Sequence, residues 1–170
     1  VLAATGFTAD DLALVKEYEK SVAIFRTANL SLGINLMQAL VKAAAQVLGD
    51  AFDGEKKEKH HNLKKDAPSG TALMLADSVN EAFDGQKEFV YGREGIVGAR
   101  EKKEVGIHAV RGGTIVGEHE VIFAGEDEVI EFKHTAHSKA VFAKGAVEAG
   151  KFLKGKAAGL YDMSDVIAAK

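Results

Sequence analysis

One long stretch of the chain, residues 32–48, carries apolar side chains at helical spacing. The apolar positions that share one stripe are Ile34, Met37, Leu40, Val41, Ala44, Val47 and Leu48. Ser31 is in place to cap the first turn, and Gly49 is typical of a helix end. The pattern therefore predicts a helix over residues 32–48.

Before this helix, short apolar runs alternate with one amphipathic stretch. Residues 1–7 have the pattern of a buried strand that ends in a glycine turn, and residues 22–25 predict a second short strand. Residues 9–20, between them, mix apolar and solvated positions as a helix does. The opening segment thus predicts strand, helix, strand, helix, an order that fits one end of a parallel α/β sheet.

The second half of the chain has a different pattern. After a polar, lysine-rich segment at 53–66, a helix is expected from about Pro68 to Phe83, and a last helix over about 138–153. Between them lie a short strand near 89–91 and three strands separated by glycine turns, which predict an antiparallel meander. These three strands are expected at 105–110, 114–123 and 128–133. The whole predicts an α+β fold: a mixed β-sheet with helices on one face, plus the remnant of an α/β Rossmann-like domain.

Composition narrows the class of protein. The chain has 170 residues, 46% hydrophobic and 28% charged, as in soluble globular domains, and its net charge of −3 disfavours a nucleic-acid partner. We expect no apolar run to approach the ~20 residues that cross a bilayer, and therefore no membrane association. The absence of cysteine excludes disulfides and thiolate metal sites, and it favours a reducing, cytoplasmic setting.

The densest chemistry lies in the sequence HHNLKKDAPSGTA at residues 60–72. With Pro68 near the first helical position, Ser69, Gly70 and Thr71 would expose backbone N–H groups at a helix N-terminus, which suits a carboxylate or phosphate. The histidines and lysines just upstream can transfer a proton or hold an anion near neutral pH. The segment predicts a receptor for a small dianion with a proton donor beside it. The alternative is an ordinary helix cap that follows a solvated loop.

This segment resembles the signature of the dihydrodipicolinate reductase family, and four further segments agree with that family in the same order. They are ANLSLGIN at 28–35, similar to the A-N-F-S-x-G-x-N junction between the family's two domains, YGREG at 91–95, VRGGTIVGEH at 110–119 and GLYDM at 159–163. The resemblance covers essentially the whole chain, and five ordered motifs make coincidence remote.

The resemblance implies a nicotinamide-dependent reductase of the diaminopimelate and lysine pathway. Such enzymes use NADH or NADPH to reduce a dehydrated form of 4-hydroxy-tetrahydrodipicolinate to tetrahydrodipicolinate, with the hydride from the nicotinamide and a proton from the enzyme. The substrate would be a small-molecule dicarboxylate. The family also implies a homotetramer assembled through the sheet. The choice between NADH and NADPH stays open.

The resemblance also implies roles for individual residues. His60 would be the general acid/base, and Lys64 the proton donor beside the substrate. His61 would bind the substrate, while Gly70 and Thr71 would hold one of its carboxylates.

A second group of residues is implied on the cofactor side. The group comprises Ala3, Ala4 and Thr5 in a turn at the nicotinamide ribose, Thr27, Ala28, Asn29 and Leu30 in a loop at the nicotinamide, and Arg111, which would approach the cofactor or the substrate.

The sequence departs from the family in its dinucleotide-binding part. The family opens with a glycine-rich loop of the G-x-x-G-x-x-G type that binds the pyrophosphate, and the sequence contains no such loop. We therefore expect residues 1–30 to be the remnant of a dinucleotide-binding domain. Residues 31–139 would form the substrate-binding, catalytic and oligomerisation domain, and residues 140–170 a helix and tail that return to the dinucleotide-binding domain. This chain alone is expected to bind the cofactor poorly.

A second departure lies just before the histidines, where the family has an apolar strand of the D-I-E-I-I-E type. Here DGEKKE at 53–58 puts Lys56 and Lys57 at positions where apolar residues are expected. Two charges in a central strand would be costly. We therefore expect this strand to lie at a sheet edge or to be loosened.

Two alternatives to a working reductase remain. One is a non-catalytic fragment that folds and oligomerises but lacks the cofactor-binding half. The other is a different nicotinamide enzyme on a similar two-domain plan, which the DAPSGT string at 66–71 disfavours. The six histidines do not form a four-ligand pattern with nearby acids, so we expect no metal site, and His108 and His119 are expected to be structural.

Overall fold

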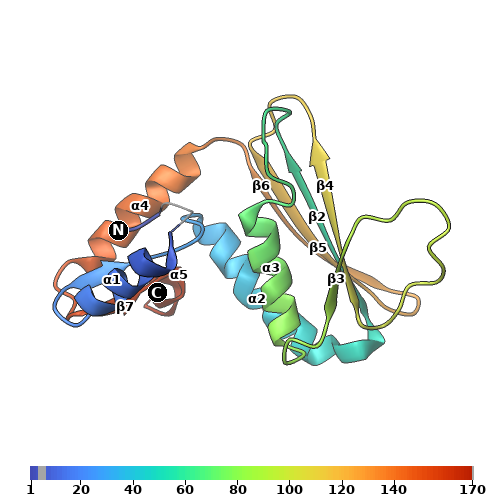
Figure 1. Cartoon of the computed structure of the whole chain (residues 1–170), viewed down its shortest axis with the longest axis horizontal. Coiled ribbons are helices and arrows are strands. Elements are labelled where there is room, and N and C mark those ends of the chain that lie inside the picture. The colour runs from blue at the N-terminus through green and yellow to red at the C-terminus, as the bar shows by residue number, and fades with distance from the viewer. Residues whose placement is uncertain (4–6, 170) are drawn as a thin grey trace. The chain divides into compact units, whose positions relative to one another are not determined.

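The computed structural model describes residues 1–3 and 7–169, which form two compact units. The first unit comprises residues 1–36 and 139–170, and the second comprises residues 37–138. Figure 1 shows the elements of both units, coloured along the chain.

The first unit contains a small parallel sheet and three helices. Strand β1 (Ala23–Phe25) pairs in parallel with β7 (Gly159–Tyr161), and Leu2 forms a parallel bridge to Arg26. The helices are α1 (Ala9–Tyr18), α4 (Ala140–Leu153) and α5 (Met163–Ala168). Phe25, Ala149, Met163 and Val166 form its buried core. The parallel pairing agrees with the strand and helix order predicted for the opening segment.

Local sequence explains where two of these helices begin. Thr8 caps α1 and exchanges hydrogen bonds with Asp11, and Asp162 caps α5 and does the same with Asp165. In each capping box the side chains satisfy backbone N–H groups that have no partner inside the helix. The aspartate of the GLYDM segment is therefore a helix cap.

The second unit is a five-stranded mixed sheet with helices packed on one face (Figure 1). Its strands are β2 (Asp53–His60), β3 (Glu88–Tyr91), β4 (Glu104–Arg111), β5 (Gly117–Ala124) and β6 (Val129–Ala136). The spatial order is β3-β4-β2-β5-β6. The first three of these run parallel, and β5 and β6 are added as antiparallel neighbours. The predicted α+β class is confirmed.

Two helices cover that face. They are α2 (Leu32–Leu48), which continues into the short 3-10 helix η1 (Gly49–Ala51), and α3 (Gly70–Glu81). The core between helices and sheet consists of Met37, Val41, Ala45, Leu75, Val79, Val105, Val121 and Phe123. Leu40 and Val47, which were placed on the apolar stripe, are 46% and 85% exposed. The buried stripe of α2 instead follows the i, i+4 spacing of Met37, Val41 and Ala45.

Residues 32–51 are long and apolar enough, by length and composition alone, to cross a membrane. The expectation that no apolar run approaches this length is therefore wrong. Three side chains of α2 nevertheless pack into the core beneath the sheet. A core helix of this kind passes the same test, so we interpret α2 as part of the protein core.

The strand before the histidines is central, which corrects the expectation of an edge or a loosened strand. Residues of β2 pair with β4 on one side and with β5 on the other. Lys56 points into the buried side and is 1% exposed, but its Nζ donates to the carbonyl oxygens of Lys57 at 2.8 Å and Glu120 at 3.4 Å. Because these carbonyls solvate the amine, the strand tolerates a lysine at its centre.

The predicted antiparallel meander is also wrong in part. Strands β5 and β6 form the expected hairpin, but β2 lies between β4 and β5. The connection after Arg111 crosses the end of β2, where the Gly112 N–H donates to the His60 carbonyl and the Asn62 N–H donates to the Gly113 carbonyl. The glycine turn therefore does not close a hairpin, and the next strand begins at Gly117 instead of residue 114.

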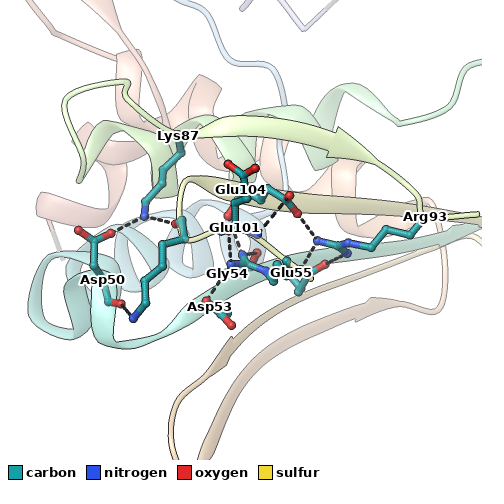
Figure 2. A network of polar contacts seen from close by, with 10 residues as sticks. Asp50, Asp53, Gly54, Glu55, Lys87, Arg93, Glu101 and Glu104 are labelled. Carbon is teal, nitrogen blue, oxygen red and sulfur yellow. Dashed lines mark hydrogen bonds and ion pairs between the residues drawn. The ribbon is translucent and has the colours of Figure 1, made fainter. Parts of the chain in front are cut away.

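The long loop between β3 and β4, residues 92–103, is fastened to the sheet face opposite the helices. Figure 2 shows Arg93 reaching both Glu55 and Glu104. Arg100, from the same loop, donates to Glu55 as well. The loop is thus held to the sheet by guanidinium groups.

Candidate active site

The centre of the candidate site is Glu58, a carboxylate on the helix-covered face of β2. Its side chain is fully buried. One oxygen accepts from Arg111 Nη2 at 2.7 Å and from the Ser69 N–H at 3.0 Å. The other accepts from Arg111 Nη1 at 2.8 Å and lies 2.5 Å from His60 Nδ1. Burial alone raises the pKa of Glu58, but the bonds from Arg111, His60 and Ser69 outweigh it, and the net pKa lies below the usual value.

His60 comes from the last residue of β2, two positions after Glu58 and therefore on the same face. Its imidazole is partly buried and meets the ring of His119 edge to face, with 5.2 Å between centroids. Gly117 makes room for it, because a Cβ at that position would lie 3.2 Å from His60 Nε2. Neighbours on both sides hold the histidine in place.

His119 lies beneath His60 and is almost completely buried. Burial, together with the positive charge of Lys56 and other neighbours, lowers the pKa of His119 to about 2. The ring is therefore neutral at physiological pH and serves as packing beside His60. This fits the structural role predicted for His119.

Lys64 and Asp66 form the second polar feature of the site. Lys64 Nζ donates to Asp66 Oδ1 at 2.7 Å, and this bond lowers the pKa of Asp66. The Asp66 carbonyl accepts from Arg111 Nη2 at 2.7 Å, so the lysine loop is tied to the same arginine that holds Glu58. The charge of Lys64 also acts on the pKa of His119, which places the amine near the histidines.

The N-terminus of α3 forms the third feature. Ser69 caps the helix by accepting from the Ala72 N–H, so Pro68 lies outside the first turn and not at the first helical position as predicted. Gly70 is exposed, and a Cβ there would meet nothing within 4 Å. The positive end of the helix dipole is therefore open to a ligand at Gly70.

Chemically, this arrangement joins an anion receptor to proton donors within one unit. The helix N-terminus and Lys64 supply positive potential, while His60 and Lys64 are groups that can donate a proton. The predicted substrate residues His61 and Thr71 belong to the same segment and are half-buried. Hydrogen bonds through Glu58, Arg111 and Asp66 link His60 and Lys64 to the start of α3.

Arg111 is engaged differently from what its predicted role suggested. Four hydrogen bonds tie its guanidinium to Glu58, the Asp66 carbonyl and the Val110 carbonyl. It is a clamp within the substrate-side cluster, and an approach to the cofactor stays a prediction.

Apart from Arg111, the described residues predicted on the cofactor side lie in the first unit. Leu2 forms a bridge to Arg26, and the Thr27 N–H donates to the Leu2 carbonyl. Ala3, the next residue after Leu2, therefore lies beside the loop at 27–30. Ala4 and Thr5 lie outside the described residues. Ala3 and the loop at 27–30 are thus adjacent, at the carboxyl end of β1, where open α/β sheets bind ligands.

Sequence reasoning missed Glu58 and the clamp role of Arg111. The signal for Glu58 was its position two residues before His60, since alternate residues of a strand share a face. Arg111 gave no comparable signal, because 53 positions separate it from Glu58. Within residues 1–3 and 7–169, no group of three or more His, Asp or Glu side chains is placed to hold a metal ion.

Comparisons with known proteins place this chain in a family. The family model described as dihydrodipicolinate reductase, C-terminus, matches residues 33–167. A protein named 4-hydroxy-tetrahydrodipicolinate reductase from Caldanaerobacter subterraneus subsp. tengcongensis is 56% identical over 167 residues, which cover 98% of this chain and 66% of that protein. One of the same name from Clostridium novyi is 51% identical, over 100% of this chain and 67% of its own length.

A solved structure has the same fold. It is a dipicolinate-bound dihydrodipicolinate reductase from Paenisporosarcina sp. TG-14, with a TM-score of 0.69 and 24% identity, over 94% of this chain and 61% of that one. This chain therefore spans about two thirds of the length of the relatives that it matches. Because the family model covers most of the chain and the relatives share half or more of its residues, the chain belongs to the dihydrodipicolinate reductase family.

Proposed function

We propose that this protein reduces 4-hydroxy-tetrahydrodipicolinate to tetrahydrodipicolinate with NADH or NADPH, as part of diaminopimelate and lysine biosynthesis in the cytoplasm. The observation that carries the proposal is the cluster formed by the Glu58–His60 pair, the Lys64–Asp66 pair and the open N-terminus of α3. The names of the relatives and the dipicolinate bound by the structural neighbour support the same substrate class.

In this proposal the second unit binds the dicarboxylate. Gly70 and Thr71, at the helix N-terminus, hold one carboxylate, because exposed N–H groups and the helix dipole favour an anion there. His61 contacts the substrate, and Lys64 adds charge at the same place. His60 or Lys64 supplies the proton that balances the reduction.

In the same proposal, the loop at 27–30 contacts the nicotinamide. The Thr27 hydroxyl donates to the Asn29 carbonyl at 2.8 Å, and the Asn29 side chain accepts from the Ser31 N–H at 2.8 Å. These bonds fix the loop, and Leu30 packs on the core of the first unit. Thr27, Ala28, Asn29 and Leu30 would hold the cofactor with Ala3, Ala4 and Thr5, and the bound nicotinamide would supply the hydride.

The predicted domain boundaries belong to the same proposal. Residues 1–30 and 140–170 are assigned to the dinucleotide-binding domain, and residues 31–139 to the substrate-binding domain. The two compact units, which divide near residues 36 and 139, support this division.

A homotetramer through the sheet is part of the proposal as well. On the face opposite the helices, Lys57 pairs with Glu120 and Lys59 pairs with Glu118. Charges that are paired within one chain can be covered by a second copy without leaving an unpaired buried ion. Light scattering on the purified protein would measure the assembly.

The test is calorimetric titration of the chain with 2,6-pyridinedicarboxylate, a planar dicarboxylate. Lys64→Ala is expected to weaken binding more than tenfold, while Lys65→Ala, which removes the neighbouring exposed lysine, changes it less than twofold. Gly70→Val should abolish binding without unfolding the chain, because its side chain would stand in open space over the helix N-terminus. Equal effects of the two lysines, or no saturable binding to the folded chain, would favour the non-catalytic alternative.

A further inference from the structure

Glu58 neither contacts the substrate nor transfers the proton in the proposed function, yet its buried carboxylate has every acceptor position in use. A carboxylate has about four lone-pair positions on its two oxygens. Here four donors occupy them: two from Arg111, one from Ser69 and one from His60. Such complete satisfaction keeps Glu58 ionised despite its burial.

An ionised Glu58 determines which nitrogen of His60 carries the hydrogen. Its oxygen lies 2.5 Å from Nδ1 and can only accept, so Nδ1 must be the donor. In the neutral ring this leaves Nε2 with the lone pair, and in the charged ring Nε2 carries the proton that can be given away. Nε2 lies on the side where Gly117 has no side chain.

We infer that Glu58 is a positioning residue that holds His60 as the Nδ1–H tautomer and directs Nε2 to the proton transfer, with Arg111 as the clamp that holds Glu58. The tautomer is a property of the folded chain alone, whereas its catalytic consequence rests on the proposed function.

Arg111 extends this arrangement to the rest of the site. Each of its two Nη atoms donates to one oxygen of the Glu58 carboxylate, and this bidentate geometry fixes the orientation of the carboxylate as well as balancing its charge. The same guanidinium also donates to the Asp66 carbonyl, and the Asp66 side chain accepts from Lys64. The orientation of His60 and the position of the Lys64 loop therefore depend on one ion pair.

The same strand offers a matched control on its opposite face. Glu55 is also bound by arginines, and it too contacts a histidine, with 2.8 Å between its Oε2 and His108 Nε2. The bonded nitrogen differs, so His108 should be the Nε2–H tautomer and His60 the Nδ1–H tautomer. One protein thus carries both tautomers, each set by its own carboxylate.

The experiment is histidine-selective 15N NMR of the chain, with long-range proton couplings that identify the tautomer of each ring. Wild-type His60 is expected to be Nδ1–H. Glu58→Gln should shift His60 toward the Nε2–H form and leave His108 unchanged, because the glutamine amide can donate to Nδ1. Glu55→Gln should alter His108 alone. A wild-type His60 in the Nε2–H form, or a His60 signal that Glu58→Gln leaves unchanged, would overturn the inference.

A second variant protects the test against misfolding. Glu58→Gln leaves the partly buried Arg111 without its anion, so the double variant Glu58→Gln with Arg111→Gln removes both charges. It is expected to show the same tautomer change in a folded chain. Retention of the Nδ1–H tautomer in the folded double variant would contradict the role of Glu58.

Because this chain alone is expected to bind the cofactor poorly, turnover at saturating NADH or NADPH supplies the catalytic readout. Glu58→Gln should lower kcat more than tenfold with KM changed less than twofold, and Glu55→Gln should leave both near wild type. Equal loss in both variants would indicate a general structural effect and contradict positioning. An inactive wild type whose His60 is Nδ1–H would count against the proposed function and not against the tautomer assignment.

Discussion

Two carboxylates on the same strand, Glu58 and Glu55, have the same partners in kind and differ in what they build. Glu58 faces the helices, is fully buried, contacts His60 directly, and is itself held by one bidentate arginine. Glu55 faces the other way with 20% of its side chain exposed, and it gathers two arginines from the loop at 92–103 (Figure 2).

The difference shows how burial decides what an acid, an arginine and a histidine do together. On the dry face, which is the helix-covered face of β2 that carries Glu58, every donor is fixed. The ion pair of Glu58 with Arg111 can therefore orient His60 as a proton donor. On the opposite face, which is more exposed to solvent, Glu55 binds two arginines, and these bonds fasten the loop to the sheet. The arrangement on the dry face is therefore expected to be more sensitive to the loss of any one member.

The largest expected effect is the loss of one arginine from each carboxylate. Arg111→Ala leaves Glu58 buried without its guanidinium and should lower the free energy of unfolding by about 3–5 kcal/mol. Arg93→Ala leaves Glu55 with Arg100 and should cost only about 1 kcal/mol, since that pair is partly exposed. Urea unfolding followed by circular dichroism measures both. Equal losses would mean that burial does not separate the two faces.

Lys56, which is buried on the same face of β2 as Glu58, gives a second test of burial on that face. Burial lowers the pKa of Lys56 to about 7, from 10.5 in the unfolded chain. The unfolded chain therefore binds more protons between pH 7 and 10.5, and the cost of burying the lysine is complete below pH 7 and disappears as the pH rises. Lys56→Met should raise the free energy of unfolding by about 2–4 kcal/mol at pH 6 and less at pH 9. Destabilisation at pH 6 would show that the amine's hydrogen bonds outweigh its desolvation.

The sequence predicted much of this second unit but not its central strand. The helix at 32–48, the start of a helix near Pro68 and the cluster of His60 with Lys64 follow from patterns that are local in the chain. The strand DGEKKEKH at 53–60 has no apolar alternation, so its central place could not be predicted. Its buried polar groups are satisfied by Arg111 and the Glu120 carbonyl, which lie 53 and 64 residues away from their partners. Contacts at that range leave no periodic trace in the sequence.

On the more exposed face, opposite the helices, acid is expected to lower the stability of the fold through Glu55. Burial raises the pKa of Glu55, but bonds from Arg93, His108 and Arg100 outweigh it and lower the pKa from 4.5 to about 2. Because the folded pKa is the lower one, the stability gained is present above pH 4.5 and is lost as the pH falls toward 2. The shift corresponds to about 3 kcal/mol at most. The check is urea unfolding from pH 6 to pH 2.5, where Glu55→Gln should flatten the acid limb. An unchanged slope would assign the acid sensitivity to other carboxylates.

The smallest effects are expected from two glycines that make room for these groups. A Cβ at Gly106 would lie 1.9 Å from Glu55 Oε2, so Gly106→Ala must displace that carboxylate and should cost about 1–2 kcal/mol. A Cβ at Gly117 would lie 3.2 Å from His60 Nε2, a gap that a shift of a few tenths of an ångström relieves. Gly117→Ala should therefore change the free energy of unfolding by less than about 0.5 kcal/mol.

The two alanine variants separate stability from orientation, because each disturbs a different member of its cluster. Although it hardly changes stability, Gly117→Ala should move the His60 15N signals, while Gly106→Ala should move those of His108 and leave His60 in place. Thermal unfolding and histidine NMR on the same samples provide both readings. If Gly117→Ala left the His60 signals unchanged, the ring would not be held against Gly117, and the room that this glycine provides would have no part in directing Nε2.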